Sequence, residues 1–112
     1  MSDAADRLFA LTVHPRDGGM CVVLAGEFDL ATAGAIERET SALLDAGCGI
    51  VEVDLRALEF IDSAGVHELL RCRDLAAERD ALLRLRIAPG AVQRALSICA
   101  VLDQFDVEMQ SS

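Results

Sequence analysis

Apolar residues follow a strand pattern in some segments of this chain and a helix pattern in others. The order in which these segments alternate limits the folds that the chain can adopt. In residues 50–55 and 83–87 apolar side chains alternate with others, as in a strand, and a segment of helical periodicity follows each. Strands linked through helices form parallel pairs with right-handed crossovers, which few topologies satisfy. The predicted order is β-β-α-β-α-β-α-β, a single α/β domain whose mixed, mostly parallel sheet has helices packed against it.

The remaining strands are defined by turn residues. Strands are expected over residues 8–14 and 20–25, joined into an antiparallel hairpin by the cluster Pro15-Arg16-Asp17-Gly18-Gly19. Gly26-Glu27-Phe28-Asp29 is expected to break the second strand, and residues 105–108 to form the last one.

The three helices are predicted from their apolar faces and their end signals. Asp29 or Thr32 is expected to cap the first helix, and Gly47 to end it. The predicted inward positions are Ala33, Ile36, Leu43 and Leu44 in the first helix, Val66, Leu69, Leu70 and Ala77 in the second, and Val92, Ala95, Leu96 and Cys99 in the third.

Length and charge exclude several classes of function. The 112 residues suffice for one domain, expected over residues 7–109, with flexible termini at 1–6 and 110–112. A formal net charge of −9 argues against nucleic acid or an anionic membrane as a partner, because both require a basic face. No apolar run is long enough to cross a bilayer, and residues 1–6 lack the order of a signal peptide. We therefore expect a cytoplasmic protein.

The four cysteines do not form a recognisable site. None belongs to a CxxC pair, and neither histidine has the spacing that would complete a zinc site. We expect buried or half-buried thiols, with no metal and no cofactor.

The turn Asp62-Ser63-Ala64-Gly65 is the most informative local feature. It joins the third strand to the second helix, and a helix N-terminus stabilises negative charge, so a phosphate on Ser63 would be tolerated there. The alternative is that Ser63 is only the N-cap of this helix, with Asp62 a turn residue. His67 is expected to be a solvated helix residue. The residues predict no enzyme, because no base is evidently placed to activate Ser63 and no G-x-S-x-G elbow is present.

Three stretches extend this reading to nearly the whole chain. They are Leu24-Ala25-Gly26-Glu27-Phe28-Asp29, residues 53–66, which include Phe60-Ile61-Asp62-Ser63-Ala64-Gly65, and residues 89–96. From about Leu8 to Val107 the sequence resembles the STAS domain of the anti-sigma factor antagonist family. The resemblance implies that the unphosphorylated protein binds an anti-sigma factor with serine kinase activity and so frees a sigma factor. Phosphorylation by that kinase would release the complex, and a serine phosphatase would reset it.

The resemblance also assigns roles to residues. It places the phosphoacceptor at Ser63 and the partner-binding surface at Asp29, Asp62, Ser63, Ala64 and Gly65. Many relatives carry a second serine where this chain has Ala64, and many have Ser-Gly-Leu where it has residues 99–101, Cys-Ala-Val. Stand-alone STAS domains also act as scaffold or sensory modules that bind a different regulatory protein, and that alternative stays open.

Overall fold

The computed structural model describes residues 9–110 and contains one five-stranded sheet. Its strands are β1 (Phe9–Arg16), β2 (Gly19–Phe28), β3 (Ile50–Ile61), β4 (Leu82–Ile87) and β5 (Asp106–Met109). They lie side by side in the order β1-β2-β3-β4-β5, with β1 antiparallel to β2 and every other neighbouring pair parallel. The predicted mixed, mostly parallel sheet is confirmed.

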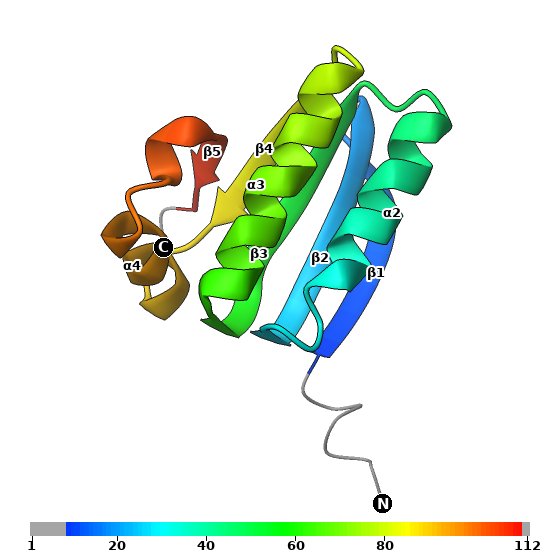
Figure 1. The fold of residues 1–112 in the computed structure, drawn as a ribbon. Helices are drawn as coiled ribbons and strands as arrows, with labels where there is room; N and C mark the ends of the chain where they lie inside the picture. The colour runs from blue at the N-terminus through cyan, green and yellow to red at the C-terminus, as the bar shows by residue number, and fades with distance from the viewer. Residues whose placement is uncertain (1–8, 111–112) are drawn as a thin grey trace, which may run out of the picture.

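Two long helices cover one face of this sheet (Figure 1). Helix α2 (Gly34–Asp45) lies in front of β1 and β2, and α3 (Ser63–Glu78) lies in front of β3 and β4. The short helix α4 (Ala91–Ile98) follows β4, and a single 3₁₀ turn, η1 (Leu102–Gln104), leads into β5. The predicted order of strands and helices is therefore correct.

The core lies between the sheet and α2 and α3, and it consists mainly of Leu, Val and Ile. Its members with less than 2% exposure include Val22, Leu24, Phe28, Ile36, Val51, Val53, Leu55, Leu69, Leu85, Ile87 and Leu96. Two predicted inward residues, Ala77 and Cys99, are exposed instead. In α3 the buried face runs through Cys72 and Ala76, which continue the 3–4 spacing from Leu69, and Ala77 lies one position beyond that face.

Strands β2 and β3 extend beyond their predicted ends. Gly26 was expected to break β2, but the strand continues to Phe28 because two irregularities in its pairing with β3 absorb the glycine at φ +94°. Strand β3 continues beside β2 as far as the pair Phe28 and Ile61, six residues past the expected end at Leu55.

The other boundaries shift by one or two residues. Pro15 and Arg16 belong to β1, so the first turn reduces to Asp17 and Gly18, both with positive φ. The last strand begins at residue 106, and Gln110, expected in the flexible end, donates its N–H to the Ile87 carbonyl at 2.7 Å. The expected terminus 1–6 and the predicted strand start at residue 8 lie outside the described residues, as do residues 111–112.

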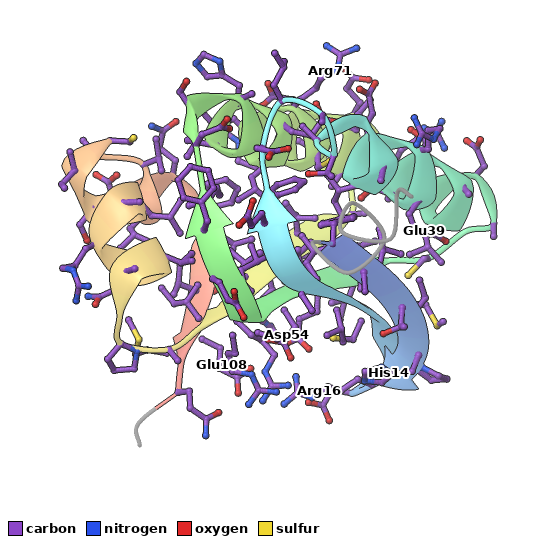
Figure 2. The ribbon with its side chains drawn as sticks, turned by 90° about the horizontal axis from the view of Figure 1, so that it is seen from below. His14, Arg16, Glu39, Asp54, Arg71 and Glu108 are labelled. Carbon is purple, nitrogen blue, oxygen red and sulfur yellow. The ribbon has the colours of Figure 1, made fainter. Side chains whose placement is uncertain are left out.

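The face of the sheet turned away from α2 and α3 carries charged side chains (Figure 2). Two acids of β3, Glu52 and Asp54, are only 3% and 5% exposed there. Arg16 forms an ion pair with Glu52. Arg56 donates to both Asp54 oxygens, at 2.9 and 2.8 Å, and an Arg86 nitrogen lies 3.5 Å from Oδ2. Burial raises the pKa of Asp54, but its hydrogen bonds with Arg56 and the charges of Arg56 and Arg86 outweigh burial and lower that pKa overall.

The same network joins β5 to the rest of the sheet. Arg84 pairs with Asp106 at 2.9 Å, and Glu108 lies 3.8 Å from Arg86 and 3.6 Å from Arg16. Arg84 and Arg86 are thus engaged in ion pairs on a polar strand face, as the alternation of β4 predicted. These pairs neutralise much of the charge on a face that none of the described helices covers.

Candidate functional site

The predicted site lies where the parallel strands end. The carboxyl ends of β2, β3 and β4 meet at one edge of the sheet, because these strands are parallel. Phe28 and Ile61 are neighbours in the last β2–β3 pair, so the residues that follow them, Asp29 and Asp62, leave the sheet side by side. The Asp62 N–H donates to the Phe28 carbonyl at 3.3 Å and ties the two chain segments together. The structure thus brings two of the predicted site residues to one place.

Asp62, and not Ser63, is the N-cap of α3. Its backbone is extended (φ −110°, ψ −174°), and its carboxylate accepts the Gly65 N–H at 3.0 Å. Its carbonyl accepts the Val66 N–H at 3.0 Å, which closes the first helical turn. The alternative in which Ser63 caps the helix and Asp62 is only a turn residue is therefore wrong.

Ser63 is the first residue of α3 and is exposed. Within residues 9–110 its hydroxyl takes part in no hydrogen bond, because the neighbouring Asp62 already performs the capping role. The hydroxyl stands at the positive end of the helix dipole, which favours an added negative charge. The chemistry that this arrangement permits is transfer of a phosphoryl group to a free surface hydroxyl without loss of a helix cap.

Gly65 lies inside the molecule and allows α3 to approach β2 closely. A Cβ atom at Gly65 would lie 2.7 Å from the Phe28 carbonyl oxygen and 2.8 Å from Cγ1 of Ile61. Any side chain would push the start of α3 away from the end of β2. Ala64 is half-buried, as are Asp29 and Asp62, so Ser63 is the most exposed of the predicted site residues.

Asp29 stabilises the turn that precedes α2. Its carboxylate accepts the Ala31 N–H at 3.0 Å and the Thr32 hydroxyl at 3.3 Å, and its carbonyl accepts the Ala33 N–H at 2.8 Å. The helix itself begins at Gly34 with no side-chain cap. The prediction that Asp29 or Thr32 caps α2 is therefore wrong: the N-cap is Ala33, and both residues stabilise the turn before the helix.

Two exposed apolar side chains lie close to these acids in the sequence, and neither was among the predicted site residues. Leu30, which follows Asp29, is 81% exposed, and Phe60, two residues before Asp62, is 47% exposed. Large apolar residues that stay exposed next to polar ones are typical of protein–protein contact surfaces. Their signal in the sequence was weak, because an apolar residue beside a strand end usually belongs to the core.

Two carboxyl groups, Glu37 of α2 and Glu68 of α3, interact where these helices meet. Burial and the charge of Glu37 raise the pKa of Glu68, whereas a hydrogen bond from Arg71 lowers the pKa of Glu37. Arg71 Nε lies 3.0 Å from Glu37 Oε1. His67, also in α3, is exposed, as predicted for a solvated helix residue.

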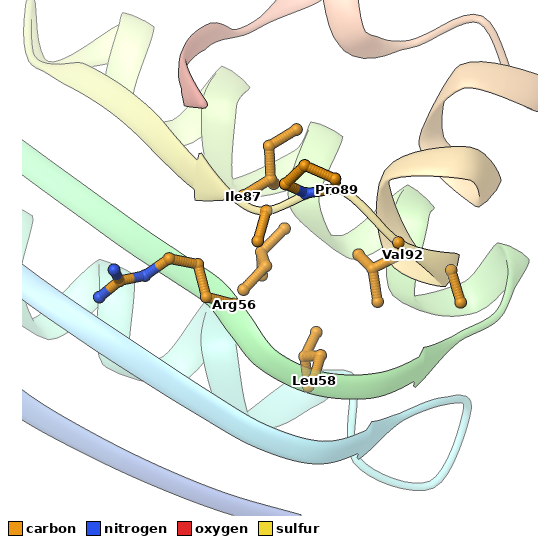
Figure 3. A pocket seen from close by; sticks show the side chains of 9 residues that line it. Arg56, Leu58, Ile87, Pro89 and Val92 are labelled. Carbon is orange, nitrogen blue, oxygen red and sulfur yellow. The ribbon is translucent and has the colours of Figure 1, made fainter. Parts of the chain in front are cut away.

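A small pocket opens at the same edge of the sheet (Figure 3). Its volume is about 150 Å³, and it lies between the middle of β3, the end of β4 and the start of α4, with Leu55, Leu58, Ile87, Pro89 and Val92 in its wall. Arg56 stands at the rim, but its side chain extends away from Pro89 and Val92, and its guanidinium binds Asp54 (Figure 3). This cation is already engaged outside the pocket.

The cysteines differ in exposure. Cys21 and Cys72 are buried, and Cys48 is half-buried, as predicted. Cys99 is exposed, contrary to the prediction, because α4 ends before it. Mainly because of burial, the pKa of Cys21 is raised to about 11 and that of Cys72 to about 12, so both are protonated thiols at neutral pH.

Comparison with solved structures finds the same fold in anti-sigma factor antagonists. One from Mycobacterium paratuberculosis is 23% identical, with a TM-score of 0.78 over 88% of this chain and 84% of that one. SpoIIAA in its unphosphorylated form is 20% identical, with a TM-score of 0.66 over 92% and 89% of the two chains. The phosphorylated form of SpoIIAA from Bacillus is 17% identical, with a TM-score of 0.66 over 92% and 93%.

Sequence comparison identifies the family. No curated protein matches the sequence significantly. Within the described part of the chain, no helix has the length and apolar character needed to traverse a membrane. The family model described as "Mlab, STAS domain" matches residues 12–105, which is most of the chain. The protein therefore belongs to the STAS domain family, with the fold of the anti-sigma factor antagonists.

Proposed function

We propose that this protein is an anti-sigma factor antagonist controlled by phosphorylation of Ser63. In its unphosphorylated form it binds an anti-sigma factor that is a serine kinase, and the sigma factor is released. The observation that carries the proposal is the exposed Ser63 hydroxyl, left free by the Asp62 cap at the start of α3. A cytoplasmic location and a serine phosphatase that restores the hydroxyl belong to the same proposal.

The surroundings of Ser63 supply a physical reason for release. A phosphate adds a charge of roughly −1.5 to −2 next to the Asp62 cap, so acidic groups that the partner presents to this turn are repelled. Leu30 and Phe60 provide apolar contact area, and a doubly charged group near such a contact is costly to desolvate. Each loss of about 1.4 kcal/mol lowers affinity tenfold, so repulsion and desolvation together suffice for a switch. The helix N-terminus tolerates the charge, so the protein itself stays folded.

The proposal is tested with matched baits in a native extract of the source cells. Unmodified protein and Ser63→Ala should both capture an ATP-binding kinase, whereas Ser63→Asp should not. Ser97→Asp, at an exposed serine near the end of α4, adds the same charge elsewhere and should capture the kinase normally. With the purified kinase and ATP, mass spectrometry should locate the phosphate on Ser63 and find none on the Ala variant.

A second function has one observation in its favour. The family model that matches this chain is described by Mlab and not by an anti-sigma factor antagonist, which fits a stand-alone STAS module that binds another regulatory protein. Equal capture of one non-kinase partner by the unmodified and Ser63→Asp baits would favour this scaffold or sensory role. It would also reduce Ser63 to an ordinary surface residue.

A further inference from the structure

The two edges of the sheet differ in how well they are protected. Strand β5 is four residues long, and two of its residues, Asp106 and Glu108, are charged. Strand β1 is eight residues long, and residues 9–13 carry no charge. Within residues 9–110, β1 pairs only with β2, so half of its backbone N–H and C=O groups point away from the sheet without a partner strand. Long uncharged edges of this kind pair readily with another strand.

The side chains of β1 point to the same surface. Phe9, Leu11 and Val13 lie on the helix-covered side of the sheet, but each is only half-buried. Their direct neighbours on β2 include Leu24 and Val22, which are fully buried. The apolar layer of the core thus continues onto the edge strand and is incompletely covered there, so a further strand beside β1 would extend its burial.

At that edge, a second copy of this acidic chain would meet no repulsion from carboxylates of β1. The protein carries a net charge of −9, yet residues 9–16 contain no carboxylate, so two β1 strands meet without opposing acids. Two identical strands pair antiparallel about a two-fold axis, which satisfies both outer edges at once. Pro15 has no N–H to donate, and this limits the pairing to residues 9–14.

We propose that two copies associate through β1, antiparallel, to form one continuous ten-stranded sheet. Helix α2 lies between this edge and α3 in each protomer (Figure 1), so both Ser63 sites remain accessible. The dimer presents two such sites, and a partner with two binding surfaces gains avidity from it. This inference does not depend on the identity of the partner or on phosphorylation.

The test is sedimentation of the complete chain over a range of concentrations. A single strand pair is small for an interface, so a reversible dimer is expected, populated at roughly 100 μM and above. Thr12→Lys places a charge at an exposed position of β1 and should lower the association constant roughly tenfold or more. Met109→Lys, on the opposite edge strand, is the matched control and should dimerise normally. Urea unfolding of both variants checks that they fold.

Two further measurements identify the surface. Amide exchange in residues 9–14 should slow as the concentration rises. Association should strengthen in salt, because the Debye length falls from about 10 Å at 0.1 M to about 3 Å at 1 M. A monomer at about 0.5 mM would overturn the proposal, as would a dimer unaffected by Thr12→Lys. Protection of the outward-pointing β1 amides in a monomer, independent of concentration, would show that the chain covers its own edge and would also overturn it.

Discussion

Replacing Asp62 with alanine removes the side-chain cap of α3. The Gly65 N–H then loses its acceptor at 3.0 Å, which costs about 1 kcal/mol. Loss of a negative charge at the helix N-terminus adds roughly 0.3–1 kcal/mol. The expected decrease in the free energy of unfolding is therefore about 1–2 kcal/mol. For a domain of this size, each kcal/mol corresponds to a fall of roughly 4–8 °C in melting temperature.

The neighbouring substitution supplies the control. Ser63 is exposed and its hydroxyl has no partner among residues 9–110, so Ser63→Ala should change stability by no more than about 0.5 kcal/mol. Asp62→Asn keeps an acceptor for Gly65 without the charge and should fall between the two. Urea unfolding at neutral pH measures all three. A loss for Ser63→Ala equal to that for Asp62→Ala would refute the assignment of the cap and would make any binding effect of Ser63 ambiguous.

Three further predictions follow from the same contacts. Gly65→Ala should destabilise the protein by about 2 kcal/mol in urea unfolding, because the new methyl group would lie 2.7 Å from the Phe28 carbonyl oxygen; wild-type stability would show that α3 shifts freely. The pKa of Asp54 is lowered by folding, so its contribution is present above its unfolded pKa of about 3.9 and is lost as the pH falls through the folded pKa. Asp54→Asn should therefore lower the free energy of unfolding at pH 7. It should also reduce the dependence of that free energy on pH between about pH 5 and 3; an unchanged pH dependence would contradict the lowered pKa of Asp54. Asp29→Ala removes the hydrogen bonds of the turn before α2 and should lower the melting temperature slightly. It should lower partner affinity, measured by calorimetry, by the larger amount when both changes are expressed as free energies. A lower melting temperature with unchanged affinity would show that Asp29 is only a turn residue.

Sequence patterns predicted the order of strands and helices because each element carries its own periodicity. Strand β4 shows this best, since Leu83, Leu85 and Ile87 are buried while Arg84 and Arg86 are not. Strand ends were less predictable. Gly26 predicts the end of β2, but the strand continues through it because its pairing with β3 is irregular there.

The N-cap of α3 could not be predicted from the sequence, because two adjacent residues were equally suitable. Asp62 and Ser63 are both good N-caps, and the backbone angles of Asp62 decide between them. The buried acids of β3 were also missed. Alternation separates Glu52 and Asp54 from the apolar residues of β3, but their burial depends on arginines from β1 and β4, which are distant in sequence.

The ion pairs on the uncovered face have a consequence for synthesis of the chain. Arg16, at the end of the first strand, reaches Glu108, in the last strand, at 3.6 Å. Residues 106–109 are synthesised after strands β1 to β4, so Arg16 can pair with Glu52 before the Glu108 carboxylate is made. The charged face is therefore completed only when the C-terminal strand leaves the exit tunnel. A nascent chain that has already formed α2 and α3 still exposes the edge of β4, until β5 pairs with it.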